Sequence, residues 1–437
     1  MTRLRSLFAA LLTLGSLATT AHAQIVIEVP GRADLPIAVP VPQSASAAAT
    51  ETAASLWSTL KRDLKMTGYF NLIDPDAYLD RYGGVEPGSF KWDDWQLLAP
   101  SVLVKTRVLG KGNLACDPKG ESVCLDVFIY HASTSDLLAK ERLRTRAVSS
   151  RYLAHEAADL VVQTITGRPG PFSQRLIAVT ARSGNKEIAL LDLDGKGVTP
   201  LTRNGSINLS PAISSEGEQL VWTSYRRGNP DVFTKHMKTG RVGVLSNHLG
   251  VNVSPTWSPD KRWVALARTE GADSDIVVLD AATGALVHRV TRGGGIDVAP
   301  SFSPDGSLLA FASERSGGSQ IYISNVDGSN PRRVTFKGTF NGDPVFHPSG
   351  EQIAFVGRER GGFDIYIVDI DGRNLRRITQ DMRDNEDPSW SPDGMYLAFS
   401  STRTGRSEVW ISTADGRHQV PVTSSGGWTQ PSWLGGH

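Results

Sequence analysis

Two residue markers recur through the C-terminal part of the chain with the same spacing and the same count. A proline returns at steps of 43 to 45 residues, and a turn glycine returns at steps of 44 or 45 residues. The prolines are Pro211, Pro255, Pro300, Pro344, Pro388 and Pro431. The glycines are Gly195, Gly240, Gly284, Gly328, Gly372 and Gly416. Six copies at this period predict a repeat architecture in which each copy is one supersecondary unit.

The stretch from Ala299 to Thr335 shows most clearly what one copy contains. Ser303-Pro304-Asp305-Gly306 and Asp327-Gly328 are turn sequences, because proline presets φ and glycine accepts a positive φ. Strands are predicted around these turns, at 301–302, 308–313, 320–325 and 332–335. Four strands in about 44 residues are typical of one blade of a β-propeller.

The two series of markers are offset, and the offset predicts how the ring closes. The glycines begin at Gly195, whereas the prolines begin at Pro211 and end at Pro431, close to the C-terminus. The sixth blade is therefore expected to take its innermost strand from the C-terminal residues and its outer three strands from Leu176 to Leu201. Pairing both ends of the repeat in one sheet removes an exposed edge. The predicted fold of residues 172–437 is an all-β, six-bladed propeller closed by N- and C-terminal strands in one blade.

Residues 24–168 lack this period and are predicted to form a small α/β or α+β domain. Helices are expected at 50–65 and 152–165, where apolar residues recur at helical spacing, and strands at 102–108, 125–130 and 137–145. The stretch Gly167-Arg168-Pro169-Gly170-Pro171 is rich in helix breakers and is expected to join the two domains.

The first 23 residues have the pattern of a secretory signal peptide. Arg3 and Arg5 precede an apolar run from Leu7 to Ala18, and Ala21-His22-Ala23 fits a cleavage site. We expect a mature chain that begins at Gln24; the alternative is an uncleaved membrane anchor. In an exported protein the only two cysteines, Cys116 and Cys124, are expected to form a disulfide. A zinc site would need more ligands than these two and His131.

Charge and motifs argue against several classes of function. Lys plus Arg number 46 and Asp plus Glu number 45, so no net field points to nucleic acid or to an anionic membrane. The sequence has no nucleophile elbow, phosphate loop or zinc-protease motif, and we expect no enzyme activity. His155-Glu156 is interpreted as a salt-bridging pair on a helix surface, and His347 as a turn cap.

The loops between second and third strands, and those that lead into each first strand, share one face of a propeller around the mouth of its channel. The residues three before each proline are Asn208, Asn252, Asp297, Asn341, Asn385 and Trp428, with Asp343, Glu386 and Asp387 adding acidity. The second-to-third loops carry Arg182, Arg226, Arg227, Arg268, Arg315, Arg358, Arg360 and Arg403. Convergent unpaired donors and acceptors would suit the capture of a polypeptide segment. The alternative is that the Asn and Asp side chains only form local turns.

The order of a signal peptide, a small domain, a Gly-Pro-Phe joint at Gly170–Phe172 and repeats such as Pro388-Ser-Trp-Ser-Pro-Asp-Gly394 resembles the TolB family of the Tol–Pal system. The resemblance implies a monomeric periplasmic binding protein without a cofactor that supports outer-membrane integrity and constriction during cell division. It implies a Pal-like peptidoglycan-associated lipoprotein at the propeller mouth, TolA at the N-terminal segment, and other envelope proteins as further partners. That segment is Gln24, Ile25, Val26, Ile27, Glu28 and Val29. Insertion into a membrane is not expected.

Two alternatives belong to other classes of protein. A propeller-bearing hydrolase would need a further catalytic domain with a nucleophile elbow, and the chain ends at His437. A metal-dependent enzyme acting on small molecules would need several inward carboxylates. Asp297, Asp343, Glu386 and Asp387 leave loose calcium binding open, and metal analysis separates this case from the others.

Overall fold

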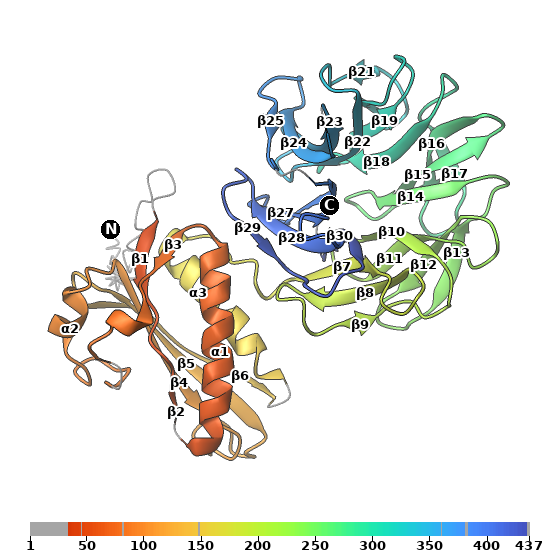
Figure 1. Cartoon of the computed structure of the whole chain (residues 1–437). Helices are drawn as coiled ribbons and strands as arrows, with labels where there is room; N and C mark the ends of the chain where they lie inside the picture. Colours follow the sequence, from red (N-terminus) through yellow and green to blue (C-terminus); the bar gives the residue numbers. More distant parts are fainter. Residues whose placement is uncertain are drawn as a thin grey trace, which may run out of the picture.

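The computed structural model describes residues 34–44, 46–80, 83–146, 149–359, 361–380 and 383–434. The predicted signal peptide and the segment Gln24–Val29 lie outside these residues. The described chain forms a small mixed domain followed by a ring of six sheets, so the predicted fold class is confirmed (Figure 1).

The N-terminal part is one six-stranded sheet with its two long helices on one face. The strands are β1 Leu35–Ala38, β2 Gln43–Ser44, β3 Phe70–Leu72, β4 Val102–Leu109, β5 Ser122–His131 and β6 Asp136–Arg146. Their order is β3-β1-β4-β5-β6, with β2 also paired to β4. The pairs β1–β3, β1–β4 and β2–β4 are parallel, whereas β4–β5 and β5–β6 are antiparallel. The sheet is therefore mixed, as an α/β or α+β domain requires.

Helices α1 (Ala47–Met66) and α3 (Tyr152–Thr166) lie side by side against this sheet (Figure 1). Leu56, Leu60 and Leu64 repeat every four residues on α1 and are all buried, because residues at that spacing share one helix face. The short elements η1 (Pro75–Ala77) and α2 (Trp92–Gln96) lie in the connection between β3 and β4. Near the start of β5, Cys116 and Cys124 form the predicted disulfide, with their Cα atoms 5.6 Å apart.

The propeller has six four-stranded sheets, which we number as blades one to six from β10. Blade one contains β10 Asn208–Ile213, β11 Gln219–Ser224, β12 Asp231–His236 and β13 Val242–Ser246; blade two contains β14 Asn252–Trp257, β15 Trp263–Glu270, β16 Asp273–Asp280 and β17 Leu286–Arg289. Blade three contains β18 Asp297–Phe302, β19 Leu308–Ser313, β20 Gln320–Asn325 and β21 Arg332–Arg333; blade four contains β22 Phe340–Phe346, β23 Gln352–Arg358, β24 Asp364–Asp369 and β25 Arg376–Arg377. Blade five contains β26 Asn385–Trp390, β27 Tyr396–Ser401, β28 Glu408–Thr413 and β29 Gln419–Pro421; blade six contains β30 Trp428–Trp433, β7 Arg175–Thr180, β8 Glu187–Asp192 and β9 Thr199–Pro200.

The recurring turn glycines have a steric role in packing the blades together. Gly328 has a φ of +88°, a conformation that side chains rarely adopt, and it lies against the preceding blade. A Cβ at this position would lie 2.3 Å from the carbonyl oxygen of Val290. At five of the six glycines a Cβ would lie within 2.9 Å of a carbonyl oxygen of the preceding blade, whereas nothing lies within 4 Å at Gly240.

Blade six closes the ring in the predicted way. Its sheet has the order β30-β7-β8-β9, and Trp433 near the C-terminus is paired with Leu176. The inner strand comes from the end of the chain and the outer strands from the start of the repeat region. Closure by strands from both ends of the repeat is therefore confirmed.

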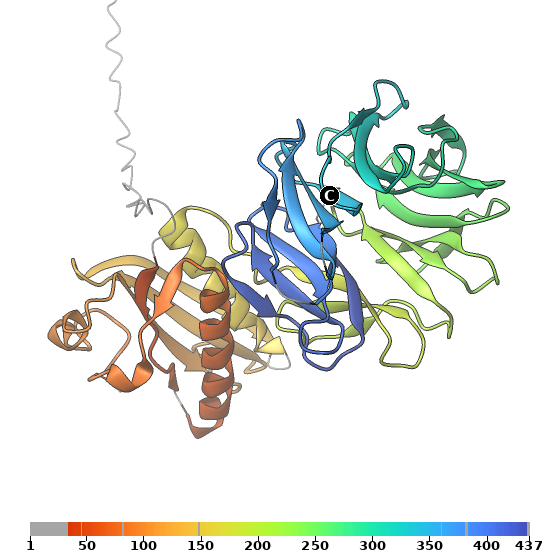
Figure 2. The same cartoon turned by 45° about the horizontal axis from the view of Figure 1, so that its top comes forward.

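The two domains share a hydrophobic cluster and a network of charged side chains. Leu56 and Leu153 of the helices belong to the same buried cluster as Leu191 and Trp433 of blade six, and the N-terminal domain lies next to this side of the ring (Figure 2). Arg151, just before α3, forms ion pairs with Asp192 at the end of β8 and with Asp194 in the turn that follows, at 2.6 Å to the latter. The junction is therefore apolar at its centre and ionic beside it.

The interpretation of His155 as a surface residue was wrong. Its side chain is fully buried in this junction, where Nδ1 lies 2.6 Å from Oδ2 of the equally buried Asp63 on α1. Burial raises the pKa of Asp63, and the neighbouring His155 opposes that shift. His347 does cap its turn, because its Nδ1 accepts a hydrogen bond from the backbone N–H of Ser349 at 3.0 Å, as predicted.

Candidate functional site

The six residues predicted to ring the mouth stand at equivalent positions of the six inner strands. Five of them are the first residue of their strand, and Asn341 is the second residue of β22. The propeller arranges these strands around its axis, so the six positions form one ring at one end of the channel (Figure 1). The predicted grouping therefore follows directly from the repeat.

These side chains are buried and bonded within the propeller. None of Asn208, Asn252, Asp297, Asn341, Asn385 and Trp428 is more than 3% exposed. Asn208 Nδ2 donates to the carbonyl oxygens of Lys186 and Ser206, at 3.1 and 3.2 Å, and Asn252 Nδ2 donates to that of His248 at 2.8 Å. The prediction of unpaired donors and acceptors was wrong for Asn208, Asn252 and Asn385, since each Nδ2 donates to a carbonyl oxygen of the loop that precedes its strand. It was also wrong for Asp297, whose carboxylate accepts from Arg315.

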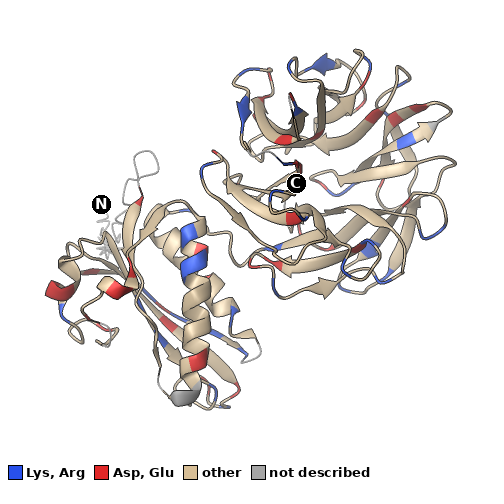
Figure 3. Ribbon diagram, viewed as in Figure 1, with Lys and Arg blue, Asp and Glu red and all other residues tan. Residues whose placement is uncertain are grey.

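Two of the predicted arginines bend back over the blade instead of reaching outward. The guanidinium group of Arg315 lies 3.1 Å from the carboxylate of Asp297, and that of Arg403 donates to Asn385 Oδ1 at 2.9 Å. Both groups also lie over aromatic rings of the same blade, with Arg403 4.4 Å from the ring centre of Trp410. These arginines therefore cap the ends of blades three and five. Over the propeller as a whole, acidic and basic residues are interspersed (Figure 3).

The channel is lined by a different set of residues, those immediately before each proline. All six have a positive φ between 48° and 55°, although none is glycine. They are Ser210, Ser254, Ala299, Asp343, Asp387 and Gln430. In every inner strand the pairing register shifts at this point, which is the mark of a β-bulge. Together with the prolines, these residues surround a cavity of about 170 Å³.

Two carboxylates give one side of this channel an acidic character. Burial raises the pKa of Asp343 to about 7, and the charges of Asp387 and Glu386 add to the shift. Burial also raises the pKa of Asp387, whose Oδ2 accepts hydrogen bonds from Ser400 Oγ at 2.7 Å and from the Gln430 backbone N–H at 3.1 Å. The sequence placed both Asp residues near the mouth but missed Gln430. The signal that could have found it is its place directly before the repeat proline.

Metal chemistry receives no support from the described part of the chain. It contains no group of three or more His, Cys, Asp or Glu side chains arranged to hold a metal ion. Loose calcium binding by the acidic residues stays an untested prediction. Of the helices between residues 34 and 434 that the structure describes, none has the length and apolar character needed to cross a membrane.

Comparison with known proteins identifies the family. Residues 162–435 match the family model for the TolB β-propeller domain, and residues 23–116 match that for the TolB amino-terminal domain. The chain belongs to the TolB family. Its propeller is thus a TolB propeller, and the mixed domain before it includes the TolB amino-terminal domain.

Curated relatives agree with this assignment. The chain is 34% identical over 265 residues to the Tol-Pal system protein TolB of Desulfosudis oleivorans, covering 60% of this chain and 58% of the relative. It is 31% identical over 278 residues to a TolB homologue of Chlorobium luteolum, covering 62% of this chain and 61% of the relative. The chain thus matches about three fifths of the length of these two proteins.

A solved structure shows the same fold across both domains. TolB of Acinetobacter baumannii superposes with a TM-score of 0.79, covering 92% of this chain and 97% of that one, at 23% sequence identity. A TolB described as putative, from Agrobacterium tumefaciens, covers 59% of this chain with a TM-score of 0.50 at 19% identity. At these identities the two likenesses concern the fold alone.

Proposed function

We propose that this chain is a periplasmic protein-binding component of a Tol–Pal system. A Pal-like lipoprotein would bind at the propeller mouth and TolA at the N-terminal segment Gln24–Val29, so that the chain helps to maintain the outer membrane and to constrict it during division. The observation that carries this proposal is the match of two TolB domains in order along one chain, together with a relative named as a Tol–Pal system protein. Family membership also favours a binding protein over an enzyme.

The geometry of the mouth suggests which residues would contact a partner. The ring residues themselves are buried, but the residues before three of them are exposed and apolar: Ile207 is 44% exposed, Val251 37% and Ile296 44%. Leu249 beside them is 89% exposed. Exposed apolar side chains that gather on one face are common at protein–protein interfaces. We therefore assign the partner contact to this apolar rim over blades one to three, with the buried ring as its support.

The experiment uses the mature chain and the soluble domain of the Pal-like lipoprotein from the same organism. The double substitution Ile207→Asp and Val251→Asp is expected to weaken binding at least about tenfold, because a charge is placed in an apolar contact. The melting temperature should stay unchanged, since both side chains point to solvent. Val242→Asp is the matched control, because Val242 is 41% exposed on the outermost strand of blade one.

A second arm concerns the N-terminal segment. Deletion of Gln24–Val29 is expected to abolish binding of TolA, measured by calorimetry, while binding of the lipoprotein domain persists. If the rim variant binds the lipoprotein domain as tightly as the parent chain, the mouth assignment is wrong. If the deletion leaves TolA affinity intact, the assignment of the N-terminal segment fails independently.

A further inference from the structure

An arginine folded over an aromatic pair recurs in three blades at the same position. In blades one, three and five the second and third strands carry directly opposed aromatic residues, as in Phe311 opposite Tyr322. An arginine two residues beyond the second strand then lies over this pair. The ring-centre distances are 4.1 Å for Arg226 over Phe233, 5.1 Å for Arg315 over Tyr322 and 4.4 Å for Arg403 over Trp410.

In two of these blades the guanidinium group is fixed by the same kind of acceptors. Arg315 Nε donates to Ser313 Oγ at 2.7 Å and Nη2 to the Asp297 carboxylate at 3.1 Å. Arg403 Nε donates to Ser401 Oγ at 2.9 Å, and its Nη2 donates to Asn385 Oδ1 at the same distance. The arginine position thus lies between an aromatic ring and the oxygen acceptor of the first residue of the inner strand, Asp297 or Asn385. An aromatic face beside such an acceptor suits a guanidinium group.

Blade four keeps the aromatic pair but lacks the arginine. Phe355 and Tyr366 are opposed in the same register and stack with their ring centres 5.6 Å apart. At the position of Arg315 and Arg403, 44 residues from each, stands Glu359. The adjacent Arg358 turns the other way, with Nε donating to the Gly361 carbonyl oxygen at 3.1 Å.

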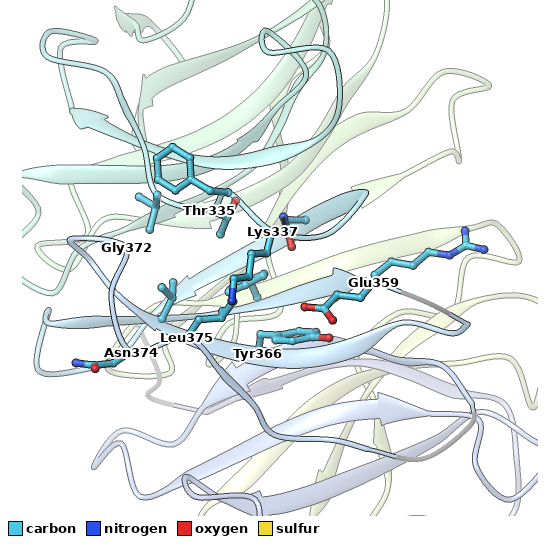
Figure 4. A pocket seen from close by; sticks show the side chains of 13 residues that line it. Thr335, Lys337, Glu359, Tyr366, Gly372, Asn374 and Leu375 are labelled. Atoms are coloured by element: carbon cyan, nitrogen blue, oxygen red, sulfur yellow. Dashed lines mark hydrogen bonds between the residues drawn. The ribbon is translucent and has the colours of Figure 1, made fainter.

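The space that the arginine fills elsewhere is a cavity of about 300 Å³ between blades three and four (Figure 4). Glu359 reaches toward the ring of Tyr366 from one side, and Lys337 lies across from it (Figure 4). Burial, with the charge of Glu359 as a smaller cause, raises the pKa of Tyr366. The cavity therefore has an aromatic wall and a carboxylate at its edge.

One acceptor in this cavity, Asn341 Oδ1, has no donor among the described residues. Asn341 is 3% exposed, and its Nδ2 donates to Gln320 Oε1 and to the Lys337 carbonyl oxygen, both at 2.8 Å. Among the residues that the structure describes, nothing donates to its Oδ1. In blade five the equivalent oxygen, Asn385 Oδ1, accepts from both Ser401 and Arg403. Gly357 in place of serine and Glu359 in place of arginine account for the missing donors.

Two lining side chains carry a positive charge: Arg358, whose Nε donates to the Gly361 carbonyl oxygen, and Lys337. Over the described ranges its ammonium group forms no ion pair with the carboxylate of Glu359. A lysine ammonium is also a poorer fit than a planar guanidinium to an aromatic face combined with two acceptors. The cavity thus retains an aromatic surface, a carboxylate and an amide oxygen to which no described residue donates, whereas blades three and five have an arginine at this place.

We propose that this cavity, the blade-four socket, binds an arginine side chain of a partner polypeptide. The guanidinium group would lie over Tyr366, pair with the Glu359 carboxylate and donate to Asn341 Oδ1, as Arg403 does with its own blade. That the arginine comes from a partner protein rests on the proposed binding function, whereas the binding of a guanidinium group by the socket does not. The socket itself is tested with a small probe, so the two can fail separately.

The probe is N-acetyl-L-arginine amide, added to the mature chain with isotopically labelled tyrosine rings. Saturable shifts of the Tyr366 ring signals in the NMR spectrum are expected. N-acetyl-L-citrulline amide, which has the same shape without the charge, should give none. Glu359→Gln should weaken binding about threefold, as for loss of one exposed charge pair. Glu314→Gln, in the equivalent loop of blade three, is the matched control and should change nothing.

Glu359→Arg introduces the arginine that blades three and five have at this position, and its side chain should fill the socket. The probe should then no longer shift the NMR signals of the Tyr366 ring, while the protein stays folded. Gly357 is left unchanged, because a Cβ there would lie 2.8 Å from the Tyr366 ring. The proposal is overturned if citrulline amide binds equally well, if Glu359→Arg binds as the parent does, or if no saturable shift occurs. Binding seen only in Lys337→Ala would show that the chain's own lysine occupies the socket, and it would also overturn the proposal.

Discussion

The indole Nε1 of Trp433 donates a hydrogen bond to the backbone carbonyl oxygen of Ser389, 3.1 Å away, and so ties the last strand of the propeller to blade five. The same tryptophan pairs with Leu176 in blade six and is fully buried. One side chain therefore contributes both to closing the sheet and to joining two blades.

Trp433→Ala is expected to destabilise the propeller by about 4 kcal/mol, because it removes a fully buried aromatic side chain and leaves a cavity at the closing sheet. Chemical denaturation followed by fluorescence measures the loss. Leu249→Ala serves as the control, since Leu249 is 89% exposed and its truncation should cost almost nothing. A loss below 1 kcal/mol for Trp433→Ala would show that closure does not depend on this contact.

Arg151→Ala is expected to weaken the junction between the two domains. Its partner Asp192 is 1% exposed and keeps an ion pair with Arg175 at 2.8 Å, so the variant loses charge-assisted hydrogen bonds without leaving Asp192 unpaired, at a cost of about 2 kcal/mol. Differential scanning calorimetry should show the unfolding of the two domains separating into two transitions. Arg373→Ala removes an arginine that is 83% exposed and should leave the parent profile unchanged. A single unshifted transition for Arg151→Ala would contradict the role given to this network.

The channel carboxylate Asp343 should make stability depend on pH. Its pKa rises from 3.8 to about 7 on folding, so the folded state favours the protonated form. The stabilising contribution is complete below pH 3.8 and is lost as the pH rises through about 7. At pH 8, Asp343→Asn should therefore increase the free energy of unfolding by about 1 kcal/mol, after allowance for screening by channel water, and the melting temperature should rise with it. Near pH 4 the substitution should leave both quantities unchanged. Asp136→Asn, at an exposed position, is the control; equal shifts at both pH values would refute the assignment.

The architecture could be predicted because its markers are local. Each repeat proline and turn glycine has a backbone role that any copy of the unit requires, so Pro211 to Pro431 gave the blade count and the offset of Gly195 gave the closing strand. The helices and strands of the N-terminal domain followed from periodicity in the same way. None of this depends on where a particular side chain points.

The site depends on side-chain direction, and there the sequence was insufficient. Along a regular strand the residues one and three before each proline would share a face, but the bulge at this point breaks the alternation. The result is that Asp343 and Asp387 line the channel, whereas Asn341 and Asn385 are buried between loops. His155 was misplaced for a related reason, since its partner Asp63 is 92 residues away in sequence. The blade-four socket had a signal that was overlooked, namely glutamate at position 359 where arginine stands 44 residues to either side.

The origin of the strands in blade six has a consequence for how the chain acquires its structure. β30 follows every other propeller strand in the sequence, yet it pairs with β7, the earliest of them. Blade six is also the blade whose residues join the helices of the first domain in one cluster. Blade six, against which the N-terminal domain packs, therefore lacks its inner strand until β30 has been synthesised. Contacts between such distant parts of a sequence form slowly, so docking of the two domains should be a late event, reached only after the toroid has formed.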